Sequence, residues 1–384
     1  MSQPRLVQID SVATLRAAAS AWDDLWRRSD VSMPTCRAEL LAQWVEQFSP
    51  RAEFRALAVE DQGQWAAALP LVGCKVGRVI AAGGMPSNPW VSSGELLLDP
   101  AADLERVLDL LVAAMRRLPW SLLWLDEAVL DASRWTALQQ ALSRAAIPSL
   151  IHQRYQVAWL PIEHDWETYR QTWSGKHRQK MARCWRRLEE TGDVHLVTLT
   201  EFAPAEVETW VRRGFEIEDR SWKGPTGSSV LRVPSMFGCF VRQAQQLAQW
   251  GQLELSFLQC GQQPIAFAYG SSAKGVYHSC KIGYDPDYAA FSPGQLLRYC
   301  MLRQFHSNPE RKALDCQGPL TDAHLKWRPA YYTIGRLAVA PGCVGRALLG
   351  AYRYGWPYAR RLRGVKSESD RLDRRGSRPL APTP

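Results

Sequence analysis

The sequence predicts a mixed α/β (α+β) fold in which a mostly antiparallel sheet, flanked by helices, occurs twice along the chain. The length of 384 residues suits two domains, each large enough to bury its own core. The composition, with 46% hydrophobic and 22% charged residues, is that of an ordinary folded protein. A run of three strand-like segments followed by a helix occurs in both halves.

The first half begins with helices and continues with strands. Residues 15–26 and 37–48 carry apolar side chains at helical spacing, and Pro34 and Pro50 interrupt the pattern. Three strand-like segments joined by short turns then predict an antiparallel meander: residues 54–61, 65–73 and 79–84. After a loop, the pattern predicts a helix, a strand and another helix: residues 101–118, 121–126 and 133–145.

The second half repeats this organisation. Three strand-like segments again alternate with turns: residues 253–259, 264–271 and 276–284. The stretch FSPGQLL, a helix to about residue 305 and a short strand at residues 312–315 follow. The identity between the two meanders is weak, so the repeat is one of organisation, and two unrelated meanders are the alternative. An apolar run at residues 155–161 is expected to link the two sheets.

These patterns divide the chain into an N-terminal unit at residues 1–155, a C-terminal unit at residues 156–345 and a tail at residues 346–384. The last 32 residues hold nine Lys and Arg against three Asp and Glu, which accounts for two-thirds of the net charge of +9. The remaining chain is only mildly basic, so overall charge is poor evidence for nucleic-acid binding. We expect a disordered, solvated tail.

The sequence favours a cytoplasmic protein that works without a metal ion. No apolar run approaches the roughly 20 residues that cross a bilayer, and the first residues lack the order of a signal peptide. Nine cysteines are scattered without a Cys-x-x-Cys pair and are expected to be reduced thiols. Seven histidines show no His-x-x-x-His spacing, so no metal site is predicted.

A strongly basic segment, SGKHRQKMARCWRRLEETG at residues 174–192, is predicted to be a helix with a Ser cap and a C-terminal Gly. Beside its apolar stripe runs a stripe of four cations: Lys176, Lys180, Arg183 and Arg187. Like charges on one helix face repel each other by roughly a few tenths of a kcal/mol per pair, and an anion would relieve that cost. The stripe is either a solvated face or a surface that binds phosphate groups.

The stretch FSPGQLL lies where the third strand of the second meander passes into its helix. Pro293 fixes φ at about −65°, Gly294 lets the backbone approach a ligand, and the first amides of a helix have no partners inside it. Together with the positive end of the helix dipole, such amides suit a pyrophosphate. The stretch is either a plain turn or a phosphate-binding site in which the amides of Gly294, Gln295 and Leu296 donate.

Four motifs in order, RRLEETG, DRSWKG, GYDPDYAAFSPGQLL and DCQGPLTDAHLKW, together resemble the GNAT acyltransferase superfamily, and most closely its FemAB/CelD-like branch. Members of that branch carry two GNAT-like units in tandem, and the resemblance covers residues 173–327 well. It implies transfer of an acyl group from acyl-CoA, acetyl-CoA included, or from an acyl carrier protein, by direct attack on the thioester. The acceptor would be an amine or hydroxyl of a small molecule or of a saccharide used in polysaccharide biosynthesis.

By the same resemblance, the pyrophosphate of the coenzyme lies where the fourth strand of a GNAT unit meets its helix, at Ser292, Pro293, Gly294, Gln295 and Leu296. This stretch has one glycine, whereas the general pattern Gln/Arg-x-x-Gly-x-Gly/Ala has more. FemAB enzymes take aminoacyl-tRNA instead, so transfer from charged tRNA, with the basic helix on its phosphates, is an alternative. A further alternative is a non-catalytic scaffold that binds a nucleotide sugar or a partner.

FemAB enzymes also place a lysine near the end of the second unit at the reacting carbonyl, and Lys326 matches it in order. Such a site must orient both reactants, take a proton from the acceptor and stabilise an oxyanion. The candidate bases are Asp315, at a strand end, and His278, on the third strand, for which a structural role is equally open. Tyr284 lies at that strand's exit. Trp222 either lines the acceptor cleft or belongs to a surface turn.

Overall fold

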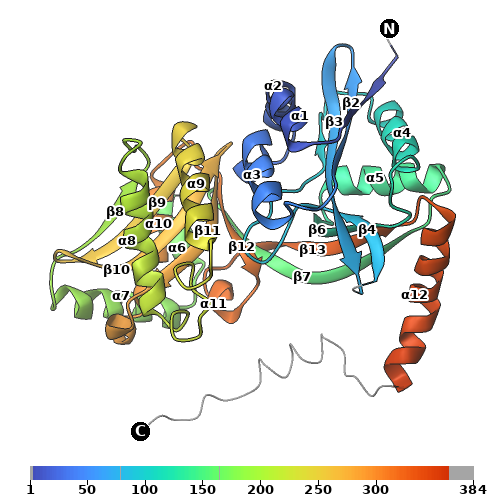
Figure 1. Cartoon of the computed structure of the whole chain (residues 1–384). Coiled ribbons are helices and arrows are strands. Elements are labelled where there is room, and N and C mark those ends of the chain that lie inside the picture. The colour runs from blue at the N-terminus through green and yellow to red at the C-terminus, as the bar shows by residue number, and fades with distance from the viewer. Residues whose placement is uncertain (1–2, 78, 164, 363–384) are drawn as a thin grey trace.

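The N-terminal unit contains the predicted antiparallel meander. The structure of the protein, a computed structural model, describes residues 3–77, 79–163 and 165–362 (Figure 1). The strands of this unit are β1 (Arg5–Ile9), β2 (Phe54–Asp61), β3 (Gln64–Val76), β4 (Ile80–Gly84), β5 (Leu97–Leu98) and β6 (Leu123–Val129). Its helices are α1 (Val12–Ala17), α2 (Ala19–Arg28), the 3₁₀ helix η1 (Pro34–Cys36), α3 (Ala38–Phe48), α4 (Leu104–Met115) and α5 (Ser133–Arg144).

The helical spacing predicts one helix through residues 15–26, whereas the structure divides it. Helix α1 ends at Ala17 and α2 begins at Ala19, because Ala18 has φ −93° and ψ 9° and does not continue the helix. Ser11 caps α1, and its Oγ accepts a hydrogen bond from the Thr14 amide at 3.1 Å. Apolar spacing indicates the buried face of a helix, but it does not locate such a break.

The C-terminal unit repeats the meander. Its strands are β8 (Val194–Leu199), β9 (Leu253–Cys260), β10 (Gln263–Ala273), β11 (Val276–Tyr284) and β12 (Ala313–Pro319). Its helices are α6 (Trp166–Gln171), α7 (Gly175–Glu189), α8 (Val207–Arg220), α9 (Met236–Gln249), the 3₁₀ helix η2 (Pro286–Phe291), α10 (Pro293–His306) and α11 (Asp322–Leu325). The predicted strands β9 to β11 and the basic helix α7 are present, and so is the predicted helix α10, which begins inside FSPGQLL at Pro293.

Two long strands join the units. Strand β7 (Ser149–Pro161) pairs with β13 (Ala330–Val339) along most of its length and with β12 through its last residues. Strand β13, which the predicted boundaries place in the C-terminal unit, pairs with β6 of the N-terminal unit. The predicted boundary at residue 155 therefore falls inside a strand that pairs with strands of both units. The expected role of residues 155–161 as a link between the sheets is confirmed.

The described part of the chain forms one sheet of 13 strands, in which β5 pairs with β3 beside the main order. That order is β1-β2-β3-β4-β6-β13-β7-β12-β11-β10-β9-β8. Each unit contains one short parallel pairing, β4 with β6 and β11 with β12. The second ends where His278 lies opposite Asp315. The shared position of these parallel pairs confirms the repeated organisation.

Helices cover both faces of each unit (Figure 1). In the N-terminal unit, α4 and α5 pack around Leu111 and Trp135 on one face, and α1 to α3 pack around Trp22 on the other. In the C-terminal unit, α6, α7 and α10 share a core with Trp327, and α8 and α9 pack around Phe215. Each such side chain contributes about 1.5–3 kcal/mol through burial. The predicted α/β fold, a mostly antiparallel sheet flanked by helices, is confirmed.

The prediction of a disordered tail from residue 346 needs correction, because helix α12 (Cys343–Leu362) occupies its first part. Leu349, with 6% of its surface exposed, packs against Ala338 and Ala340 at the end of β13. Burial of this apolar contact gives the helix a reason to form that charge counting does not show. The rest of the tail, residues 363–384, lies outside the described residues. Among the described helices, none is both long enough and apolar enough to cross a membrane.

Candidate active site

His278 and Asp315, the two predicted candidate bases, lie side by side. They face each other at the last paired position of the parallel strands β11 and β12. The His278 Nδ1 atom is 3.3 Å from Asp315 Oδ2. Both residues are buried, with 2% and 4% of their surface exposed. The sequence leaves them as alternatives, whereas the structure makes them a pair.

Two further residues hold the Asp315 carboxylate. Gln317 donates from Nε2 to Asp315 Oδ2 at 2.9 Å and from its backbone amide to Oδ1 at 3.0 Å. The Tyr332 hydroxyl, on β13, lies 3.1 and 3.2 Å from the two carboxylate oxygens and donates to them. Burial and the neighbouring carboxylate raise the pKa of Tyr332, so its hydroxyl keeps its proton at neutral pH. The carboxylate is thereby fixed in one orientation beside His278.

The backbone of β12 is distorted at this point. Its pairing with β7 passes from Asp315–Trp159 to Pro319–Val157, so the register shifts between them. Gln317 has φ 58°, in the left-handed region that a residue with a Cβ seldom adopts. Distortions of this kind cost about 1–3 kcal/mol and cluster at functional sites. Here the distortion accompanies a Gln317 side chain whose Nε2 also lies 3.2 Å from His278 Nδ1.

The second nitrogen of His278 has no partner. Its Nε2 atom is buried and forms no hydrogen bond with any described residue. When Nδ1–H is directed to the Asp315 carboxylate, Nε2 carries the lone pair and can accept a proton. His278, Asp315 and Tyr332 line a cavity of about 400 Å³ that is also lined by Asp30 and Arg134 of the N-terminal unit. The pair therefore borders a space between the two units.

A larger cavity, of about 560 Å³, adjoins the first, and Met33 and Gln317 line both. Beyond His278 and Asp315, strands β11 and β12 are no longer paired with each other. Residues from both separated strand ends line this larger cavity: Cys280, Lys281, Gln317, Gly318 and Pro319. The cavity therefore lies against the opening between the two strands, next to the His278–Asp315 pair.

The N-terminal unit supplies a polar wall to the larger cavity. Glu127, at the end of β6, has φ 63° and accepts hydrogen bonds from Arg154 Nη1 at 2.8 Å and from the Tyr155 hydroxyl. Burial and the Glu127 carboxylate raise the pKa of Tyr155, which keeps its hydroxyl a donor. The loop that carries Trp90 forms another wall. A ligand in this cavity would therefore contact both units.

The predicted phosphate-binding site lies at the start of α10. Ser292, with φ 55° and ψ 52°, forms the cap of the helix. The amides of Gln295 and Leu296 donate to the Ser292 carbonyl at 2.9 and 3.1 Å, so among these three predicted donors only the Gly294 amide makes no such bond. A Cβ at Gly294 would meet the ring of Tyr284 at 3.6 Å, an ordinary contact. The expectation of three free amides is corrected to one.

Lys326 does not join His278 and Asp315. It is exposed at the end of α11 and lines neither cavity. Burial lowers the pKa of His177 on helix α7, and the charges of Lys326 and Lys180 lower it further. Lys326 therefore lies close to this helix. Lys326 is thus grouped with the basic helix, and its predicted place at the reacting carbonyl has no support from the contacts in the structure.

Tyr284 and Trp222 lie at the surface of the C-terminal unit. Tyr284, at the end of β11, is 36% exposed and lies close to Gly294, at the predicted phosphate-binding site. Trp222 is 65% exposed in the turns that follow α8. Neither lines the two cavities. Of the four predicted catalytic residues, the structure brings only His278 and Asp315 together.

The basic stripe of α7 forms as predicted. Ser174 caps the helix and accepts from the His177 amide at 3.2 Å. The four cations of the stripe are Lys176, Lys180, Arg183 and Arg187. Within the described part of the chain, no salt bridge joins any of them to a carboxylate. The Arg187 guanidinium lies 5.4 Å from the Phe291 ring, beside the start of α10. One end of the stripe therefore adjoins the predicted phosphate-binding site.

Sequence reasoning missed three residues of this site. Gln317 stands two positions after Asp315 within the quoted motif DCQGPL, and a polar side chain so close to a strand-end carboxylate is a usable signal. Glu127 and Tyr332 lie on β6 and β13. No local pattern connects those strands to His278, so only the fold could reveal them.

The comparisons with known proteins bear on residues that form most of this site. Residues 175–316 match the family model described as acetyltransferase (GNAT) domain. This GNAT match includes α7, His278, the start of α10 and Asp315, and it ends just before Gln317. A search of curated proteins finds no significant match to the chain.

Several solved structures share the fold over most of the chain. FemX has a TM-score of 0.56 at 11% identity, covering 83% of this chain and 95% of its own. A conserved protein of unknown function from Bacteroides thetaiotaomicron has a TM-score of 0.54 at 12% identity, covering 87% and 100%. The C-terminal domain (DUF2156) of a putative lysylphosphatidylglycerol synthetase from Agrobacterium fabrum has 0.51 at 11%, covering 88% and 96%. At these identities the likeness shows a common fold, which extends beyond the GNAT match into the N-terminal unit.

The described residues contain no group of three or more His, Cys, Asp or Glu side chains that could hold a metal ion. The expectation of a metal-free mechanism stays a prediction. What the site does contain is a carboxylate, an imidazole and two fixed donors, which is a set suited to moving a proton.

Proposed function

We propose that the protein is a GNAT-type acyltransferase that transfers an acyl group to an amine or hydroxyl of a small-molecule or saccharide acceptor in the cleft between its two units. The observation that carries the proposal is the His278–Asp315 pair, at the point where β11 and β12 separate, with His278 Nε2 unpartnered beside a cavity. The GNAT-domain match over residues 175–316 supports the reaction class. The donor is an acyl-CoA, acetyl-CoA included, or an acyl carrier protein.

In this proposal His278 is the general base. The acceptor N–H or O–H gives its proton to Nε2 while the acceptor lone pair attacks the thioester carbonyl. Asp315 stabilises the imidazolium that forms, as a carboxylate behind a histidine does in other acyl transfers. When the tetrahedral intermediate collapses, the C–S bond breaks and the departing thiolate takes the proton from His278. Gln317 and Tyr332, which hold Asp315, are positioning residues.

The donor's phosphates are assigned to the start of α10. Unlike the amides of Gln295 and Leu296, the Gly294 amide does not donate to the Ser292 carbonyl. The helix dipole favours an anion at this end of the helix. Arg187, beside Phe291, adds a positive charge next to this helix start. The acyl-pantetheine arm would then run into the opening between β11 and β12 toward His278. Binding through backbone and dipole suits a co-substrate that must leave after each turnover.

The decisive experiment measures thiol release and acylated product. The full-length protein is incubated with acetyl-CoA and longer acyl-CoAs together with amines, amino sugars and hydroxyl acceptors. We expect thiol release that depends on the acceptor and falls about 10²–10⁴-fold in His278→Gln, since a positioned base contributes that much. His195→Gln is the matched control, because His195 on β8 is 44% exposed and lies outside both cavities.

Two outcomes count against the proposal. A folded protein that binds no acyl-CoA by calorimetry, and that is also inactive with acylated carrier proteins, is not this enzyme. Donor binding without turnover, left unchanged by His278→Gln, would instead fit a non-catalytic scaffold. Equal activity of the His278 and His195 variants would retain the acyltransferase and reject the base assigned to it.

Transfer from aminoacyl-tRNA is the second candidate, and the unpaired cations of α7 favour it. When a protein neutralises phosphates, the logarithm of the binding constant falls linearly with the logarithm of the salt concentration. The slope is about −0.9 per neutralised phosphate on duplex nucleic acid. Replacing Lys176, Lys180, Arg183 and Arg187 by Gln should therefore make the slope of log binding constant against log salt concentration less negative by roughly three to four units. Product formed only from charged tRNA would favour this candidate, and turnover of acyl-CoA without tRNA would reject it.

A further inference from the structure

Lys281 is the one charged residue lining the larger cavity that has no ion-pair partner within the described ranges. The other charges there are neutralised. Asp126 accepts from Arg336 at 2.7 Å, and Glu127 accepts from Arg154 at 2.8 Å. The cavity therefore presents one uncompensated positive charge to whatever enters it.

The backbone of β11 explains how Lys281 reaches the cavity. In the pairing with β10, Tyr269 lies opposite Lys281 and Gly270 lies opposite Ser279, so Cys280 is an extra residue. Such a bulge breaks the alternation of side chains along a strand. Cys280 and Lys281, which are consecutive, both line the cavity as a result. A regular strand would turn one of them to the opposite face.

Two aromatic rings and a nearby ion pair set the position and charge of this amine. Lys281 Nζ lies 4.7 Å from the centroid of the Trp90 ring and 5.5 Å from that of Phe240. Burial lowers the pKa of Lys281, Glu218 raises it, and Lys223 lowers it. Glu218 is itself bound to Lys223 Nζ at 2.6 Å, so its charge is already shared. The rings hold the ammonium group by cation–π attraction without neutralising it.

We propose that Lys281 is an anion-binding residue of the cleft that receives a carboxylate or phosphate group of the acceptor. The assignment to the acceptor rests on the proposed function. In that function the donor phosphates lie at the start of α10, and the thioester end of the donor carries no charge. The anion held by Lys281 therefore belongs to the second substrate.

The rest of the cavity lining describes the remainder of this acceptor. Polar side chains of both units supply hydrogen-bonding groups along the wall: Ser87, Asn88, Gln243, Ser271 and Gln317. The ring of Trp90, which is partly exposed, offers a flat apolar surface that packs well against a sugar ring or a short carbon chain. The chemical class that fits is a compact polar acid, such as a sugar acid, a sugar phosphate or a hydroxylated amino acid. A large apolar acceptor would make no use of the hydrogen-bonding capacity that these side chains have left.

The test observes the lysine amine directly. All lysines of the full-length protein are dimethylated with ¹³C-formaldehyde, and the Lys281 resonance is identified by its loss in Lys281→Gln. Inorganic phosphate, glucuronate and uncharged glucose are then titrated in. We expect phosphate or glucuronate to shift the Lys281 resonance and to raise its titration midpoint, while glucose does neither. Lys75, exposed on β3, provides the control resonance, identified with Lys75→Gln.

The same variants define the contradicting results. Calorimetry with the effective anion should show affinity about tenfold to a hundredfold weaker in Lys281→Gln, as expected for one hydrogen bond to a charged group. Lys281→Arg should retain most of it. If no anion shifts Lys281 more than it shifts Lys75, or if Lys281→Gln binds the anion as well as the unaltered protein, the proposal is wrong.

Kinetics separate this inference from the proposed function. With an acidic acceptor, Lys281→Gln should raise KM and change kcat little, and with an uncharged acceptor it should change neither. Acyl transfer that is indifferent to Lys281→Gln with every acceptor would overturn the anion site and leave the acyltransferase standing. Anion binding by Lys281 in a protein that turns over no acyl donor would keep the site and overturn the proposed function.

Discussion

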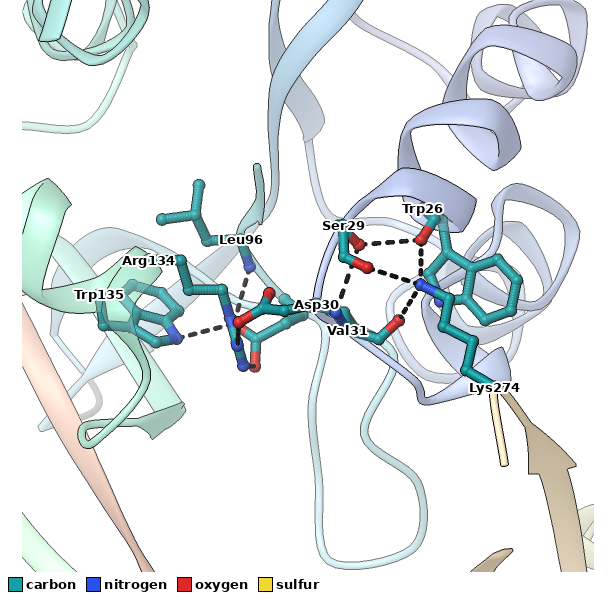
Figure 2. A network of polar contacts seen from close by, with 9 residues as sticks. Trp26, Ser29, Asp30, Val31, Leu96, Arg134, Trp135 and Lys274 are labelled. Carbon is teal, nitrogen blue, oxygen red and sulfur yellow. Dashed lines mark hydrogen bonds and ion pairs between the residues drawn. The ribbon is translucent and has the colours of Figure 1, made fainter. Parts of the chain in front are cut away.

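Lys274 holds its ammonium group over the indole ring of Trp26, 4.5 Å from the ring centroid, and so joins the two units (Figure 2). From the turn between β10 and β11 it donates to the carbonyl oxygens of Trp26, Ser29 and Val31, the last two at 2.8 Å. These carbonyls lie at and beyond the end of α2, where the helix dipole favours a cation. The contact fixes the N-terminal unit against β11, the strand that carries His278.

Replacing Lys274 by Met should destabilise the protein by about 1–3 kcal/mol, because three carbonyl oxygens lose a shared donor in a half-buried place. Chemical unfolding followed by circular dichroism measures this change. Lys75→Met, at an exposed position, is the matched control and should cost less than about 0.5 kcal/mol. Equal unfolding free energies in the two variants would show that the contact with Trp26 contributes nothing.

The pH dependence of this contact has a definite sign. Burial lowers the pKa of Lys274 to about 8, whereas a lysine in an unfolded chain has a pKa of about 10.4. Between these values the unfolded chain binds more protons than the folded one, so folded stability rises with pH in that window. Below pH of about 8 both states are protonated and the term is constant. Unfolding free energies of the unaltered protein, relative to Lys274→Met, should therefore increase from pH 8 upward; parallel curves would reject the depressed pKa.

Arg134→Met should cost more, about 3–5 kcal/mol, because it leaves a buried carboxylate without its partner. Arg134 Nη2 lies 2.9 Å from Glu95 Oε2. Its Nη1 lies 2.8 Å from Asp30 Oδ2 (Figure 2). The Glu95 side chain is 4% exposed and also accepts from Trp135 Nε1 at 2.8 Å. Urea unfolding measures the loss.

A second substitution distinguishes an unpaired charge from a lost contact. Glu95→Gln, added to Arg134→Met, removes the buried charge and keeps an acceptor for Trp135 Nε1. The double variant should therefore recover part of the lost stability. A double variant less stable than Arg134→Met alone would show that the cost comes from packing around Arg134 instead of from the charge on Glu95.

Asp315→Asn and Tyr332→Phe should lower activity to different extents. The first removes the charge that stabilises a protonated His278, so we expect a loss of about 10²–10⁴-fold in kcat. The second removes one hydrogen bond to a carboxylate that Gln317 still holds, and a loss of about tenfold is expected. Both should leave KM nearly unchanged, because neither group is assigned to substrate binding. A Tyr332→Phe enzyme as impaired as Asp315→Asn would indicate that the Tyr332 hydroxyl itself contacts the reacting groups.

How much of the fold the sequence predicts depends on whether its periodicity is local. The strands β9 to β11 alternate with turns marked by Gly261 and Gly275, and both glycines have positive φ in the structure. No local pattern predicts strand β13, because its place between β6 and β7 is decided by partners more than 170 residues away in sequence. Because β7 and β13 pair across the two units, a domain boundary placed at residue 155 falls inside β7.

The site shows the same division. The sequence places His278 on the third strand of the second meander and Asp315 at the end of the short strand that follows, and both positions can be predicted from local patterns. Their partner Tyr332 comes from the exchanged strand β13, and the cavity wall at Glu127 comes from the other unit. Lys326 is predicted only from its order along a motif, and order does not show which face of a sheet a residue reaches. Site residues that come from both units show no local pattern in the sequence of either unit.

Gly294→Trp should block the donor while the protein stays folded. A Cβ at Gly294 meets Tyr284 at 3.6 Å, so the first atom of a side chain fits, and the rest of an indole would cover the helix start. Gly294→Ala should bind acyl-CoA nearly as well as the unaltered protein. Calorimetry should show at least a tenfold loss of acyl-CoA affinity in Gly294→Trp, because the pyrophosphate loses its approach to the backbone amide.

The matched control for this change is Gly238→Trp. Gly238 also stands in the first turn of a helix, α9, and a Cβ there meets only the end of the Arg242 side chain at 3.8 Å. The two variants thus place the same bulk in the first turn of a helix, at the second residue of α10 and the third residue of α9, one at the proposed donor site and one away from it. Gln295→Ala should matter little in the same assay, because the proposed binding uses the backbone. If Gly294→Trp and Gly238→Trp bind acyl-CoA equally well, the donor does not rest on the start of α10.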